Sequence, residues 1–209
     1  MLRALKKLFK SNFLFTLGVI ICVFWIIMAI IAPVVAPYDP IVQDMTMRLK
    51  PPSAVHFFGT DSFGRDIFSR VIYGGRYSLL AGCLTVIIAG AIGTFYGAIA
   101  GYVGGRVDTI MMRILIKEII PNSISSFLIM ATTDLGNQIL MFSTLSFLGL
   151  GSAPPTPEWG MMVSDGAANF NKFWIAGFPG LAIFTMAMGA NFIGDGLRDL
   201  LDPKLRKQF

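Results

Sequence analysis

Charged residues are scarce in this sequence. Of its 209 residues, 14% are charged and 55% are hydrophobic, whereas soluble domains carry about 25% charged residues. Disorder is excluded, because disordered chains are polar and poor in aromatic residues. The 17 lysine and arginine residues form no patch interleaved with base-stacking aromatics, so no nucleic-acid partner is expected. The mean hydropathy of +0.69 indicates an integral membrane protein.

Residue types that carry enzyme or metal chemistry are also few. The chain has one histidine and two cysteines, too few for a histidine- or cysteine-based metal site. It contains no Gly-x-x-x-x-Gly-Lys-Ser/Thr phosphate loop, no Gly-x-Ser-x-Gly elbow and no His-Glu-x-x-His pair. We therefore expect no enzyme activity, no metal and no cofactor, and no ATP hydrolysis through a phosphate loop of this chain.

Four long apolar runs predict four membrane spans. A helix needs about 20 apolar residues to cross a hydrocarbon core of about 30 Å. The runs cover residues 13–32, 77–103, 123–150 and 173–193, and the third is the most polar. Eleven of the lysine and arginine residues fall in the two terminal segments and the loop 104–122, against six in the other loops. Because cytoplasmic loops are enriched in these residues, the sequence predicts an all-α polytopic protein with both termini cytoplasmic.

The external loop before the second span carries an amphipathic pattern. Asp61 has the side chain of a helix N-cap, and apolar and polar residues segregate to opposite halves of a helical wheel from there to Ile72. This pattern predicts one external helix on the membrane surface, with an external gate as the alternative. The chain then divides into residues 1–76, with the first span, the external loop and this helix, and residues 77–209, with the other spans.

Two further patterns are a proline-rich segment late in the chain and a stripe of small residues in the second apolar run. Residues 151–166 are rich in proline and predict a loop, with Trp159 as an interfacial anchor. The acidic residues of this loop, Glu158 and Asp165, are expected either to be solvated or to face a cationic ligand. Small residues recur every fourth position in the second run, which places them on one stripe of a helix. A stripe of this kind allows another helix, of this chain or of a second subunit, to approach closely. It consists of Ala89, Gly93, Gly97 and Gly101.

Several motifs together carry a family resemblance. Residues 58–70 read Phe-Gly-Thr-Asp-x-x-Gly-Arg-Asp-x-x-Ser-Arg, residues 145–151 read Leu-Ser-Phe-Leu-Gly-Leu-Gly, and residues 154–160 read Pro-Pro-Thr-Pro-Glu-Trp-Gly. With these motifs the chain resembles the inner-membrane permease subunits of ABC importers for dipeptides, oligopeptides and nickel, in the "C" branch. The external signature of that family falls on Gly59, Thr60, Asp61, Gly64, Arg65 and Asp66.

The resemblance implies a function and a set of partners. Such a permease pairs with a second permease subunit to form a translocation path through the bilayer of a bacterial-type plasma (inner) membrane. Two cytosolic ATPase subunits drive it, and an extracytoplasmic substrate-binding protein delivers the cargo. The resemblance therefore implies import of peptides or a related small solute.

The sequence departs from this family between Arg113 and Lys117. Family members usually have six spans and a cytosolic loop with a Glu-Ala-Ala pattern that seats in the ATPase. Here the third and fourth spans and nearly all of that loop are absent, so residues 77–209 resemble a shortened permease domain. We expect impaired ATP coupling, with Arg113 and Lys117 as residual cytosolic contacts or as solvated loop residues. The alternative function is a non-transporting membrane interaction protein or an inert remnant of a permease.

A charge inside the third run is a second departure. Acidic residues within membrane spans usually face the bundle interior or water. Asp134 and, one turn later, Asn137 are therefore candidates to line the translocation path. The alternatives are that the missing spans leave Asp134 exposed, or that the span ends elsewhere.

Overall fold

The computed structural model describes residues 12–103 and 120–201. Within these ranges it contains only helices and one isolated bridge, between Thr60 and Asp66, which confirms the predicted all-α class. The long helices are α2 (Phe13–Val35), α3 (Ile67–Val103), α5 (Ile120–Phe147) and α7 (Phe173–Leu201), and the short ones are η1 (Met45–Met47) and α6 (Trp159–Ala167).

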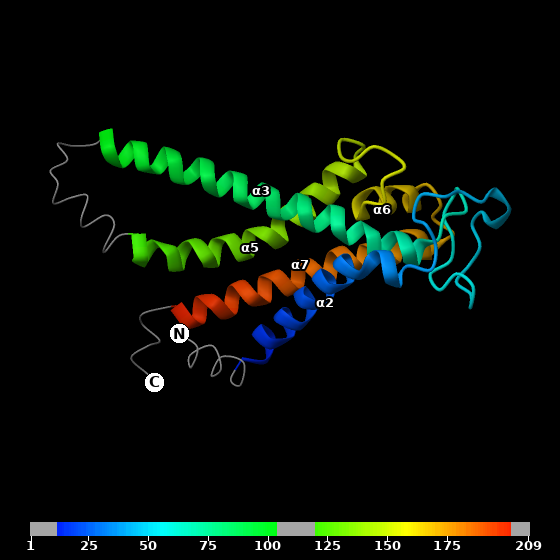
Figure 1. Ribbon diagram of the computed structural model, residues 1–209, viewed down its shortest axis with the longest axis horizontal. Helices are drawn as coiled ribbons and strands as arrows, with labels where there is room; N and C mark the ends of the chain where they lie inside the picture. The colour runs from blue at the N-terminus through cyan, green and yellow to red at the C-terminus, as the bar shows by residue number, and fades with distance from the viewer. Residues whose placement is uncertain (1–11, 104–119, 202–209) are drawn as a thin grey trace.

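The long helices form an elongated bundle with two different ends (Figure 1). Residues 36–66 and α6 gather at one end, called the loop end below, whereas α3 and α5 diverge toward the other. Helix α7 contacts α2, α3, α5 and α6, so it is the centre of the packing. The start of α2 and the end of α7 lie together away from the loop end, where Asn12 Nδ2 donates to Asp199 Oδ2 at 3.5 Å.

Three helices among the described residues are long and apolar enough to cross a membrane. Their spans are Phe13–Val35, Ile67–Gly97 and Phe173–Asp199. Helix α5 corresponds to the third predicted run, residues 123–150, and is not among these three. It has 28 residues, which at about 1.5 Å per residue is long enough to cross. Its polar residues, Asp134 and Asn137 among them, make it less apolar than the other three. The prediction of a multi-pass helical membrane protein is confirmed.

Helices α2 and α7 approach each other closely at two glycines. A Cβ atom on Gly18 would lie 2.7 Å from the carbonyl oxygen of Gly189, and a Cβ atom on Gly189 would lie 3.0 Å from Ile21 Cγ2. Only residues without side chains allow such a backbone approach. Further along α2, Trp25 Nε1 donates to Thr185 Oγ1 at 3.0 Å. The first helix is therefore fixed to α7 at several points along its length.

The separate surface helix predicted from Asp61 is wrong. Asp61 Oδ1 accepts hydrogen bonds from the backbone N–H groups of Phe63 and Arg65, at 2.8 and 3.0 Å, which closes a turn and not a helix. The N-cap is Asp66, whose Oδ2 accepts from the Ser69 N–H at 2.8 Å. Because no proline follows, the amphipathic segment continues into the span, and residues 67–76 are the first turns of α3.

A short helix, α6, forms instead inside the predicted proline-rich loop. The Glu158 carboxylate caps it by accepting from the N–H groups of Gly160 and Met161, at 2.8 and 3.0 Å. Trp159 is fully buried, so its prediction as an interfacial anchor is also wrong. Its ring meets Trp25 edge-on at 5.0 Å between centroids, and its indole N–H donates to the Val71 carbonyl at 2.7 Å.

Candidate functional site

The external signature residues form a tight turn at the loop end. Gly59 and Gly64 have φ of +75° and +73°, a backbone region that favours glycine. The Thr60 N–H donates to the Lys50 carbonyl at 3.0 Å, and the Asp61 N–H donates to the Arg65 carbonyl at 3.1 Å. The turn is therefore bonded both to itself and to the loop that precedes it.

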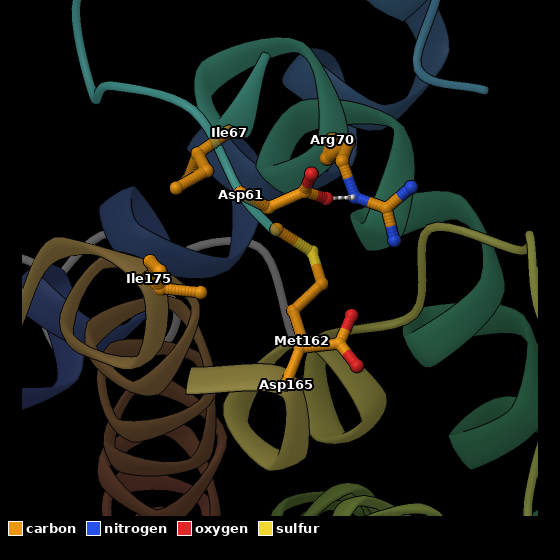
Figure 2. A pocket seen from close by; sticks show the side chains of 6 residues that line it. All are labelled: Asp61, Ile67, Arg70, Met162, Asp165 and Ile175. Atoms are coloured by element: carbon orange, nitrogen blue, oxygen red, sulfur yellow. Dashed lines mark ion pairs between the residues drawn. The ribbon is translucent and has the colours of Figure 1, made fainter. Parts of the chain in front are cut away.

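An ionic cluster is buried beneath this turn. Asp61 Oδ2 lies 2.6 Å from Arg65 Nε and 3.5 Å from Arg70 Nε, and Figure 2 shows Asp61 reaching Arg70. All three residues are at most 3% exposed. Arg70 Nη1 also donates to the Pro40 carbonyl at 2.9 Å and to the Pro155 carbonyl at 3.4 Å. Arg70 thus joins the two loops of the loop end to α3.

The cluster extends to α6 through a weaker ion pair. Arg65 Nη2 lies 3.3 Å from Asp165 Oδ2, and the Asp165 side chain is 32% exposed. Burial raises the pKa of Asp165, an effect larger than the lowering by the nearby Arg65 and Arg70 guanidinium groups. A second contact lies alongside, where Asn169 Nδ2 donates to Ser62 Oγ at 2.9 Å. The end of α6 is therefore tied to the turn by polar contacts.

Asp66, at the end of the turn, forms a second buried pair with His56. His56 Nδ1 and Asp66 Oδ1 are 2.9 Å apart, and Asp66 Oδ2 also accepts from Ser69 Oγ at 2.8 Å. The Tyr38 ring covers His56, with 4.7 Å between centroids. A cavity of about 260 Å³ opens beside the pair. It is lined by Tyr38, Asp39, Val42, Asp44, Met47, His56, Gly64 and Asp66.

The charged groups of the turn and of the neighbouring cavity are arranged to hold the loops in place and not to bind or convert a ligand. Hydrogen bonds from the Thr46 hydroxyl and N–H lower the pKa of Asp44 at the cavity rim. The space between Asp61, Arg70 and Asp165 leaves no room for a water-sized molecule, because Ile67, Met162 and Ile175 fill it (Figure 2). Since the charges of the cluster compensate one another, its role in this structure is to hold the loops and α6 on α3.

Replacing Gly64 by alanine is expected to destabilise the protein by about 1–3 kcal/mol. The added Cβ would meet the Asp44 carbonyl oxygen, and the alanine would have to adopt the left-handed backbone conformation of Gly64. The midpoint of unfolding by sodium dodecyl sulfate in mixed micelles measures the change. Gly180→Ala is the control, because a Cβ there meets no atom within 4 Å, and it should keep or raise the midpoint. Equal midpoints for the two variants would contradict the geometry of the turn.

The other predicted site residues lie away from this cluster. Ala89, Gly93 and Gly97 lie on the exposed side of α3, where a Cβ on Gly93 or Gly97 would meet no atom within 4 Å. Asp134 and Asn137 are exposed on α5. The side chain surroundings of position 101, and all of Arg113 and Lys117, fall outside the described residues. Among the predicted site residues that the structure describes, it brings together the six signature residues.

Sequence reasoning missed three members of the site. The helical-wheel pattern includes Arg70 in the polar half of a surface helix, but this residue is 1% exposed. The loop prediction leaves Glu158 solvated or facing a cationic ligand, but it is fully buried. Asp165 lies 100 residues from its partner Arg65. The family motifs include Arg70 and Glu158, and that was the available signal for these two. No local pattern pairs Asp165 with Arg65.

Two family models match the sequence. A model described as binding-protein-dependent transport system inner membrane component matches residues 111–207. Another, described as the N-terminal TM domain of oligopeptide transport permease C, matches residues 3–52. The first match begins at residue 111 and therefore contains the site of the predicted shortening, between Arg113 and Lys117.

Curated relatives match nearly the whole chain. The probable D,D-dipeptide transport system permease protein DdpC of Escherichia coli is 35% identical and covers 93% of this chain and 89% of its own length. The dipeptide permease DppC of Haemophilus influenzae is 32% identical (95% and 93%), and the oligopeptide permease OppC of Bacillus subtilis is 34% identical (95% and 88%). These alignments run over 266, 279 and 269 residues, more than the 209 of this chain. The chain is therefore internally shortened relative to them.

Proposed function

This chain belongs to the family of inner-membrane components of binding-protein-dependent transport systems, and on that premise we propose that it is a permease subunit of an ABC importer for peptides or a related small solute. The observation that carries the proposal is the match to dipeptide and oligopeptide permeases along nearly the whole chain. The protein is a multi-pass inner-membrane protein, and other subunits supply the ATP hydrolysis.

The arrangement of the bundle supports an orientation. The start of α2 and the end of α7 lie at the end of the bundle opposite the loop end. The terminal segments and the loop 104–122 carry eleven of the 17 lysine and arginine residues, which favours the cytoplasmic side for them. The loop end then faces the outside, where a substrate-binding protein docks. A second permease subunit and two ATPase subunits complete the assembly.

The missing residues bear on how this subunit couples to ATP hydrolysis. Coupling requires an element that contacts the ATPase and moves with it, because two sites exchange free energy only through a physical link. The resemblance assigns that role to a loop with a Glu-Ala-Ala pattern, and the sequence has no such run. We therefore propose that the chain keeps its place beside a partner permease but couples poorly.

Co-expression with the permease, ATPase and binding-protein genes of the same genome tests this function. We expect the partner permease to co-purify, and ATP-dependent uptake of labelled Ala-Ala into vesicles to be at least about tenfold lower than with a full-length relative, a loss on the scale of typical coupling energies. The matched control is a chimera in which the relative's extra residues are inserted between Leu115 and Ile116, and it should regain uptake.

Three outcomes separate the parts of the proposal. If no permease co-purifies and the chimera is also inactive, the assignment as a permease subunit fails. Uptake at the relative's level by the unmodified chain would refute the coupling defect alone. Co-purification with uptake regained only in the chimera supports both parts.

A further inference from the structure

Helix α5 has one face that no other helix of the described chain covers. Helix α3 packs on one side, where a Cβ on Gly82 would lie 2.8 Å from Ile139 Cγ1. Helix α7 packs on another, where a Cβ on Gly136 would lie 2.9 Å from the Ala187 carbonyl oxygen. The uncovered residues follow spacings of four, three and four, so they share one stripe. They are Met130, Asp134, Asn137 and Met141, all exposed.

Asp134 lies close to the middle of this helix. Since α5 runs from Ile120 to Phe147 and rises about 1.5 Å per residue, Asp134 is roughly 20 Å from each end. A carboxylate at this depth is unfavourable unless it faces a cation or water. Within the described part of the chain, the ion pairs of aspartates involve only Asp61, Asp66 and Asp165, and Asp134 accepts no hydrogen bond.

The neighbours of Asp134 on the stripe suit a small and variable solute. Asn137 carries an amide that both donates and accepts hydrogen bonds, as a peptide backbone does. Met130 and Met141 are 67% and 63% exposed, and methionine side chains adapt to apolar groups of different shape. The stripe therefore combines one fixed negative charge with an adaptable surface.

We infer that Asp134 contacts the α-ammonium group of the peptide during translocation, with Asn137 bonding the peptide backbone one turn further along α5. This inference rests on the proposed function, because it is the peptide cargo that supplies the cation. Charge complementarity selects this occupant, since a peptide with a free amino end carries a positive charge that an acylated peptide lacks. The side chains of the peptide would contact Met130 and Met141, which would select only weakly among side chains of different shape.

Carbodiimide labelling tests the inference without requiring transport. The full chain, together with the permease that co-purifies with it, is placed in lipid nanodiscs and treated with dicyclohexylcarbodiimide, which modifies carboxyl groups in apolar surroundings. Mass spectrometry then measures labelling at Asp134. We expect millimolar Ala-Ala to lower this labelling at least threefold and N-acetyl-Ala-Ala at equal concentration to leave it unchanged. Asp165 serves as the internal control, because it lies outside the spans, and Asp134→Asn verifies the modified position.

The other outcomes overturn the inference. Equal protection by both peptides, or by neither, would show that Asp134 does not recognise the ammonium group. Labelling that is absent without peptide would show that Asp134 is already paired with a lysine or arginine of the partner permease. In each case co-purification of the partner permease would still support the proposed function, so the two failures are distinguishable.

Discussion

Replacing Asp61 by asparagine is expected to lower the free energy of unfolding by about 3–5 kcal/mol, because it leaves buried charges without compensation. Asp61 neutralises two guanidinium groups, those of Arg65 and Arg70, and all three side chains are at most 4% exposed. Asparagine has nearly the same shape, so the loss reports charge and not volume. The midpoint of unfolding by sodium dodecyl sulfate measures the global effect. Limited proteolysis of residues 36–66 measures release of the loop that Arg70 holds.

Asp165→Asn is the matched control, since it removes a carboxylate from the same cluster. Its side chain is 32% exposed, and pairs of this kind contribute about 0–1 kcal/mol. Because burial raises the pKa of Asp165 in the folded protein, the folded state favours the protonated form. The protonated Asp165 side chain therefore adds to the free energy of unfolding. This stabilisation is complete below the ordinary pKa of aspartate, about 3.9, and is lost as the pH rises through the raised pKa of Asp165 in the folded protein. The Asp165→Asn variant should show little change in the free energy of unfolding at neutral pH. A loss equal to that of Asp61→Asn would contradict the argument that the more deeply buried carboxylate matters more.

Truncation of Trp159 to alanine is the second change for which we expect a large effect, a loss of about 3–5 kcal/mol. The side chain is fully buried and joins three helices. It belongs to α6, it meets Trp25 of α2, and it donates to the Val71 carbonyl of α3. A Cβ on Gly74 would lie 2.7 Å from its Cδ1, so the backbone of α3 lies directly against the ring. Alanine would leave a cavity where these helices meet.

Trp159→Phe separates packing from the hydrogen bond. Phenylalanine keeps most of the ring but cannot donate to the Val71 carbonyl, so a loss of about 0.5–1.5 kcal/mol is expected. Unfolding midpoints in mixed micelles compare the two variants. If both substitutions cost the same, the indole N–H and not the packing would fix α6. If neither had an effect, the buried position of Trp159 would be wrong.

The chemistry of the two halves of the bundle is different. Toward the loop end, charged residues such as Asp61 and Arg70 are buried and paired, and α6 is fixed to α3 and α7. Toward the other end, α3 and α5 diverge (Figure 1), and Gly93 and Gly97 face open space. The loop end is therefore packed by its own contacts, whereas the stripe of α3 is exposed at Ala89, Gly93 and Gly97.

Local signals in the sequence were sufficient for the long helices and for the family. Apolar runs of about 20 residues predict spans because the bilayer thickness sets their length, and α2, α5 and α7 follow those runs closely. The shift of the helix start from Asp61 to Asp66 shows where such signals fail. Both aspartates are good caps, and the choice depends on Gly64 and on the contacts of the turn with the preceding loop.

The amino-acid sequence by itself determined that this protein lies in a lipid bilayer, that it is helical and to which family it belongs. Composition, the length of hydrophobic runs and contiguous motifs can all be read without knowing which distant residues meet. Only the tertiary structure decided which charges are buried and paired. Arg65 and Asp165 are 100 positions apart, and Trp159 reaches Val71 across 88, so their contacts exist only once α3, α6 and α7 have packed. The free energy of a charge or an indole depends on its burial and its partners, and packing sets both.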